Sequence, residues 1–114
     1  MDINAVNAEY IDINDALKRI GGSMDLYKRL LKRFVDGTQV AELGTAFQEG
    51  NKDEASRLAH TVKGVAANLS LIKLRDISAE LEQIIKSDSD HTAKLAEFDL
   101  VYAETAKMIA EITG

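Results

Sequence analysis

The sequence of 114 residues contains no cysteine and no proline. The absence of cysteine excludes disulfide bonds, thiol redox chemistry and zinc sites built on thiolates, and it agrees with a reducing compartment. The absence of proline removes the residue that most strongly interrupts helices. β-branched residues also fail to alternate with polar ones over any useful length, so strands are not predicted. These absences favour an all-α protein that is stabilised by packing.

Long hydrophobic runs and an excess of positive charge are missing as well. No apolar run approaches the roughly 20 residues that cross a bilayer, and the N-terminus lacks the basic and then apolar pattern of a signal peptide. The formal net charge is −5, whereas neutralising nucleic-acid phosphates requires clustered Lys and Arg. We therefore expect a cytoplasmic protein with neither nucleic acid nor membrane as a partner.

The residues that are present describe a soluble folded chain. Hydrophobic residues make up 46% and charged residues 29% of the sequence, which is typical of globular proteins. The length suffices for one domain with a real core but not for two. We expect a single domain over residues 1–114.

Apolar residues recur at helical spacing along almost the whole chain, and small polar residues mark the breaks between helices. In the N-terminal part, Asn14 is predicted to cap a short helix that Gly21-Gly22 ends. Ser23 is predicted to cap the second helix, and Gly37-Thr38 marks either a break or a kink before a third.

Three further breaks follow, at Gly50-Asn51, at Ser70 and at the polar turn 87–90. Asn51 and Glu54 have the spacing of a capping box, and Ser70 is predicted to cap the helix after it. Short connections between helices of similar length favour antiparallel neighbours. The predicted fold is an up-and-down antiparallel four-helix bundle with a short N-terminal capping helix, complete without a second chain and hence monomeric.

The helix after Gly50 carries the feature that points to chemistry. At about 100° per residue, His60 falls roughly 170° from the middle of the apolar stripe of this helix. Lys63 and Gly64 lie on the same side of the helix as His60. Ala67 lies further along this side and, like Gly64, adds little or no side chain to the surface. Because His60 lies roughly opposite the apolar stripe, its imidazole is predicted to face water. The residues of the stripe are Ala55, Leu58, Ala59, Val62, Ala66 and Leu69.

Gly64 is an unfavourable residue inside a helix, since glycine costs roughly 1 kcal/mol there relative to alanine. Close approach of a partner to the His60 imidazole would compensate for that cost, and Lys63 supplies an ammonium suited to an anion. Each residue also has an ordinary interpretation, because glycine can serve helix packing and surface His or Lys is usually inert. Taken together, the three residues predict a phosphate-accepting site.

The run His60-Thr61-Val62-Lys63-Gly64 resembles the His-x-x-Lys-Gly signature of histidine-containing phosphotransfer (HPt) domains, which act in multistep phosphorelays. One departure is Ser70, where the family often has glycine. Further residues on both sides fit the family pattern, and these are Ile13, Ala16, Leu17, Ile20, Gly21, Gly22, Asn68, Leu74, Leu81 and Glu82.

The resemblance implies that His60 is the phosphorylated residue, that Lys63 steadies the phosphate and that Gly64 provides clearance. It also implies a polar side chain near the imidazole from the neighbouring helix, for which Glu82 and Gln83 are the candidates. Such a side chain would accept a proton from one ring nitrogen and leave the other as the nucleophile.

The implied reaction moves a phosphoryl group from an aspartyl phosphate on a response-regulator receiver domain to His60, and then to another receiver aspartate. A hybrid sensor histidine kinase is a candidate partner. The receiver would supply Mg²⁺, so no cofactor is expected on this chain, which would be a phosphoryl carrier rather than an enzyme. The expected docking residues are Ser56, Arg57, Lys63, Gly64 and Ala67.

Two alternatives remain at this point. A helical adaptor would dock a receiver without being phosphorylated, and a substrate domain of a larger sensor kinase would use the same chemistry in another setting. A start at Met1 favours the free-standing carrier over the second of these. No role is predicted for His91, which lies in a polar turn, and neither histidine has a partner at metal-ligand spacing. No phosphate-cradling glycine loop is present, so ATP binding is not expected.

Overall fold

Six helices account for most of residues 6–114, the range that the computed structural model describes. Within this range there is no strand, and a single antiparallel bridge pairs Ile11 with Leu71. The prediction of an all-α protein is therefore confirmed. The helices are α1 (Ile13–Arg19), α2 (Met24–Asp36), α3 (Gln39–Gln48), α4 (Lys52–Asn68), α5 (Ile72–Lys86) and α6 (Thr92–Thr113).

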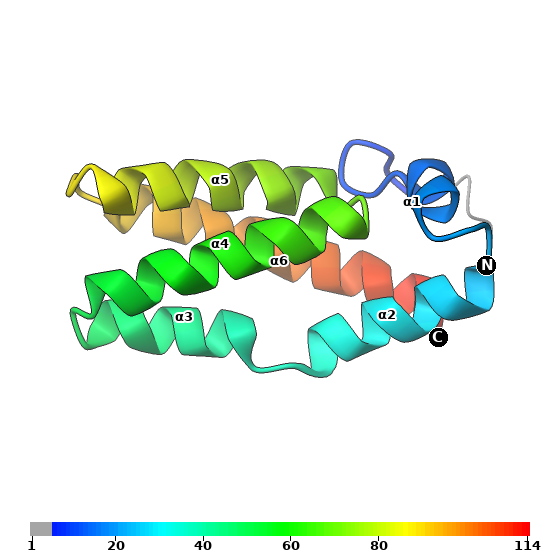
Figure 1. The fold of residues 1–114 in the computed structure, drawn as a ribbon, viewed down its shortest axis with the longest axis horizontal. Helices are drawn as coiled ribbons and strands as arrows, with labels where there is room; N and C mark the ends of the chain where they lie inside the picture. Colours follow the sequence, from blue (N-terminus) through cyan, green and yellow to red (C-terminus); the bar gives the residue numbers. More distant parts are fainter. Residues whose placement is uncertain (1–5) are drawn as a thin grey trace.

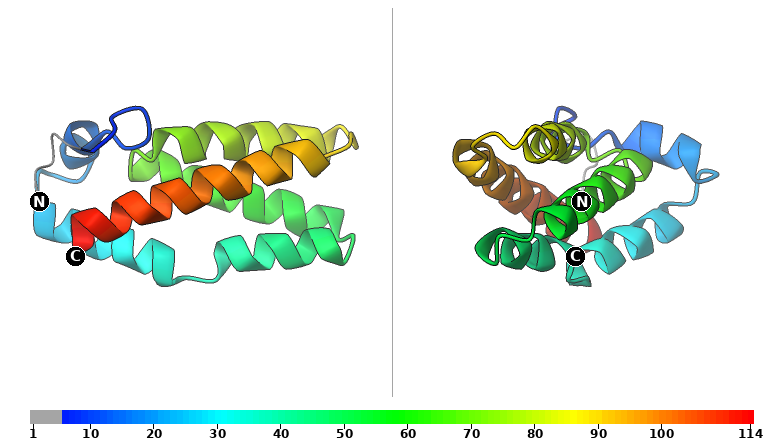
Figure 2. Two further views of the ribbon diagram at one scale, coloured as in Figure 1. Left: turned by 180° about the vertical axis from the view of Figure 1, so that it is seen from behind. Right: turned by 60° about the vertical axis from the view of Figure 1, so that its left-hand side comes forward.

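The long helices run side by side in an elongated body of 41 × 22 × 20 Å. Helix α4 packs against both α3 and α5, and α6 packs against α5 and α2. Helices α2 and α3 follow one another along the same edge of the body, and the short α1 lies at its end beside α2 (Figure 1). Figure 2 shows α6 crossing the opposite side of the molecule. None of the described helices combines the length and the apolar character needed to span a bilayer.

The first helix break forms as predicted. Gly21 and Gly22 both have positive φ, at 86° and 88°, a conformation that glycine adopts without steric strain. The Ser23 hydroxyl then accepts a hydrogen bond from the Leu26 amide at 3.1 Å and caps α2. Helix α3 is separate from α2, so the break at Gly37-Thr38 is more than a kink.

Two other helix starts differ from the predictions. Asp12, rather than Asn14, caps α1 through its carboxylate, because α1 already begins at Ile13. Asn51 does cap α4 by accepting from the Glu54 amide at 3.2 Å. The second bond of the predicted capping box, from the Asn51 amide to the Glu54 side chain, does not form, because the Glu54 carboxylate binds the Arg57 guanidinium instead.

The prediction that Ser70 caps α5 is wrong. Leu71 occupies the cap position, and no side chain accepts a hydrogen bond there. Ser70 instead adopts a φ of 54°, the left-handed region that favours glycine. Its hydroxyl donates a 2.7 Å hydrogen bond to Asp15. This bond holds α1 against the turn between α4 and α5.

The core contains the whole predicted apolar stripe of α4, from Ala55 to Leu69. Tyr27 of α2 is fully buried, and its hydroxyl donates a 2.8 Å hydrogen bond to the Leu69 carbonyl at the end of α4. Burial raises the pKa of Tyr27, so this donor keeps its proton. Contacts along its buried side therefore fix the orientation of α4, which leaves its other side free.

Candidate functional site

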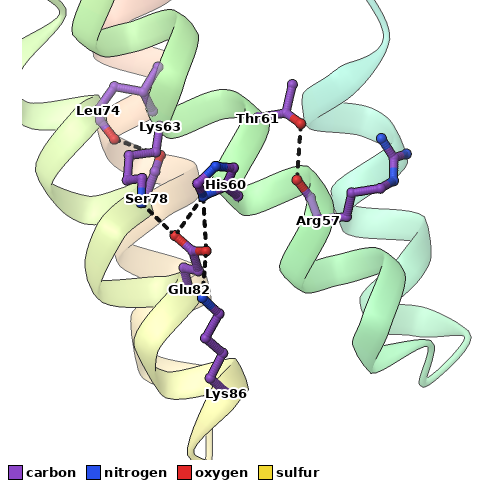
Figure 3. Close-up of polar contacts among 8 residues, drawn as sticks. All are labelled: Arg57, His60, Thr61, Lys63, Leu74, Ser78, Glu82 and Lys86. Carbon is purple, nitrogen blue, oxygen red and sulfur yellow. Dashed lines mark hydrogen bonds and ion pairs between the residues drawn. The ribbon is translucent and has the colours of Figure 1, made fainter.

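His60 projects from α4 on the side opposite the core, as its position in the helix predicts. Its side chain is 67% exposed, whereas Ala59 and Val62 on the opposite side are buried completely. The ring leans toward α5, where it meets the carboxylate of Glu82 (Figure 3). One edge of the imidazole is thus held by the protein while the rest of the side chain is open to solvent.

Glu82 lies on the face of α5 that packs against α4. Its carboxylate approaches His60 Nδ1 with Oε2 at 3.1 Å and Oε1 at 3.4 Å, and its side chain is only 4% exposed. Gln83, the other candidate for this contact, is the next residue in α5 and is exposed. One residue corresponds to about 100° around a helix. The structure therefore places Glu82, and not Gln83, against the ring.

Two lysines compensate the charge of the Glu82 carboxylate. Lys63 Nζ lies 2.8 Å from Oε1, and Lys86 Nζ lies 3.0 Å from Oε2. Burial alone would raise the pKa of Glu82, but the hydrogen bonds and charges of the two lysines outweigh it and lower this pKa to about 2. Glu82 is therefore a carboxylate throughout the neutral pH range.

The ionised state of Glu82 determines which nitrogen of His60 carries hydrogen. A carboxylate can only accept hydrogen bonds, so the 3.1 Å contact requires a hydrogen on Nδ1. In the neutral imidazole the lone pair then belongs to Nε2, on the other side of the ring. In the neutral ring the lone pair therefore points away from Glu82, on a side chain that is exposed.

Gly64 lies one helical turn beyond His60 and is exposed. A Cβ atom built at Gly64 would have no neighbouring atom within 4 Å. Helix packing therefore gives no reason for a glycine at this position. Ala67, next along this side of α4, is half-buried and adds only a methyl group.

The other expected docking residues lie on the same helix. Arg57 is exposed and bound to Glu54, and its carbonyl accepts a 3.0 Å hydrogen bond from the Thr61 hydroxyl (Figure 3). Ser56 is half-buried. The sequence predicts Lys63 as an ammonium that is available to an anion, but the structure shows it paired with Glu82 and only 33% exposed.

Lys86 is the residue of this cluster that the sequence analysis missed. A signal for it exists, because Glu82 and Lys86 are four residues apart in one helix, the spacing of a favourable ion pair. His91 lies elsewhere, at the start of α6, where its ring packs on Phe47 with centroids 4.4 Å apart. In the described part of the chain, no group of three or more His, Asp or Glu residues could hold a metal ion.

Comparison with protein families matches residues 29–113 to the model of the Hpt domain. The match covers most of the chain and includes α3 to α6 with the whole His60 cluster. A comparison with curated proteins returned no match, and a comparison with solved structures also returned none.

Proposed function

Because the chain belongs to the Hpt domain family, whose members are phosphocarrier modules of two-component phosphorelays, we propose that His60 is its phosphoacceptor. The phosphoryl group would come from an aspartyl phosphate on a receiver domain of a response regulator and pass to the aspartate of another receiver. A hybrid sensor histidine kinase would be a natural source of the first receiver. In this proposal the protein is a carrier that is regenerated by the second transfer.

The contact between His60 Nδ1 and the ionised Glu82 carries the proposal. The Nε2 lone pair attacks phosphorus, a P–N bond forms, and the P–O bond to the receiver aspartate breaks. The aspartate leaves as a carboxylate with the bonding electrons. The Nδ1 hydrogen stays on the ring, which gains positive charge as the bond forms, and Glu82 stabilises that charge through its hydrogen bond.

Lys63 and Gly64 support the transfer in different ways. Phosphoryl transfer depends mainly on alignment and on stabilising charge at the equatorial oxygens. The Lys63 ammonium binds the same carboxylate as the ring and would turn from Glu82 toward those oxygens. Gly64 lets the receiver surface approach the ring. The receiver would contribute Mg²⁺, and docking would use Ser56, Arg57, Lys63, Gly64 and Ala67.

We also propose that the protein acts as a cytoplasmic monomer with an up-and-down four-helix arrangement, in which α2 and α3 together form one of the four columns. Their placement along one edge in Figure 1 supports this description.

A labelling experiment tests the function. Receiver domains from the same genome are charged with radioactive phosphate and mixed with the protein. We expect the wild-type protein to gain label that is lost in acid and retained in alkali, as for phosphohistidine. The Lys63→Ala variant should be labelled more slowly. A protein that binds a charged receiver without gaining label would contradict the proposal and would instead be an adaptor.

A further inference from the structure

Lys86 is not needed to form the P–N bond, yet it shares the Glu82 carboxylate with His60 and Lys63. Three donors converge on this one nearly buried group: Oε1 binds Lys63, while Oε2 binds both His60 Nδ1 and Lys86. Two ammonium groups thus face one carboxylate. When the imidazole is neutral, the two lysines contribute two positive charges and Glu82 one negative charge. One positive charge is therefore left uncompensated within the cluster.

This excess becomes useful when a phosphoryl group arrives at His60. The group brings about two negative charges, and it binds to Nε2, whereas Glu82 contacts Nδ1. Lys63 must therefore turn away from Glu82 Oε1 to meet the phosphoryl oxygens. A buried carboxylate that loses its only cation is strongly destabilised, so a lone lysine would be retained by Glu82.

We propose that Lys86 is a positioning residue that keeps Glu82 compensated and thereby frees Lys63 for the phosphoryl group. This inference rests on the proposed function of His60. Lys86 is suited to the role because it binds Oε2, whereas Lys63 binds Oε1, so its contact does not depend on the position of Lys63. It comes from the last turn of α5, where a cation is favoured by the helix dipole. The Lys86 side chain is 57% exposed, whereas the side chain of its partner Glu82 is nearly buried.

The test uses phosphoramidate, a small donor with no docking surface, and measures the rate at which His60 is phosphorylated. We expect Lys86→Gln to slow this rate about tenfold, which corresponds to ~1.4 kcal/mol. Lys86→Arg should restore most of the rate, because it keeps a cation on Glu82. Thermal unfolding should show that each variant is folded.

A double-mutant cycle separates action through Glu82 from direct contact with the phosphoryl group. In a Glu82→Gln background no carboxylate holds Lys63, so Lys86→Gln should change the rate less than about twofold. The matched control is Lys32→Gln, since Lys32 forms an exposed pair four residues along α2 with Asp36 at 3.3 Å. This control should leave the rate unchanged.

Two results would overturn the role of Lys86 while leaving the proposed function intact. One is an unchanged rate for Lys86→Gln in the wild-type background. The other is an undiminished loss in the Glu82→Gln background, which would mean that Lys86 acts on the phosphoryl group directly. Failure of His60 to accept phosphate in the otherwise wild-type protein would overturn the proposed function, and this inference with it.

Discussion

Replacing His60 with glutamine is expected to abolish phosphoryl transfer from a charged receiver domain. Glutamine is polar and similar in reach, but its amide has no lone pair nucleophilic enough to form the P–N bond. The side chain is exposed and lies outside the core, so the fold should not change. We therefore expect no detectable label on His60→Gln while its thermal unfolding midpoint stays close to that of the wild type.

The second histidine of the chain provides the control for this experiment. His91→Gln also removes an imidazole, but this ring packs on Phe47. It does not belong to the Glu82 cluster. The variant should be labelled at the wild-type rate. Label remaining on His60→Gln, or lost from His91→Gln, would show that the phosphoacceptor has been assigned to the wrong residue.

Gly64→Leu is expected to slow transfer from a receiver domain about 100-fold, because a displacement of about 1 Å at the reacting atoms can have an effect of this size. The leucine side chain would stand one helical turn from His60, where the structure has open space. Phosphorylation by phosphoramidate should change far less, since this donor is small. The two donors together therefore measure steric clearance separately from the reactivity of the imidazole.

Gly64→Ala addresses stability at the same position. Because a Cβ there meets no atom within 4 Å, alanine should raise the free energy of unfolding by about 0.5–1 kcal/mol through helix propensity. Gly44→Ala in α3 is the matched control, since it also has no neighbour within 4 Å of the added atom. A loss of stability in Gly64→Ala would favour a packing role for this glycine and contradict the clearance role.

The sequence predicts the features that depend on local periodicity. The apolar stripe of α4 follows from residue spacing, and the same spacing determines that His60 faces outward. The paired glycines at 21–22 and the cap at Ser23 are also local signals, and both are confirmed. The order of the helices and the outward direction of the His60 side chain therefore follow from the sequence alone.

Features that depend on contacts between distant segments were not accessible in the same way. Serine is a residue type that often caps helices, so the sequence favours a cap at Ser70. In the structure the Ser70 hydroxyl instead binds Asp15, 55 positions away, and the Ser70 backbone is left-handed. Likewise, the sequence offered two candidates for the contact with His60 and could not choose between them. The rotation of α5 against α4 makes that choice, and it also brings Lys86 into the cluster.

The proposed transfer depends on the charge of Glu82, which keeps hydrogen on Nδ1 of His60 and leaves Nε2 as the nucleophile. Nitrogen NMR of the imidazole in the unphosphorylated protein, at a pH where the ring is neutral, shows which of the two nitrogens carries the hydrogen. We predict that Nδ1 of His60 carries the hydrogen and that Nε2 is bare. A neutral His60 ring with its hydrogen on Nε2 would mean that Glu82 does not direct the tautomer and that Nε2 is not the nucleophile.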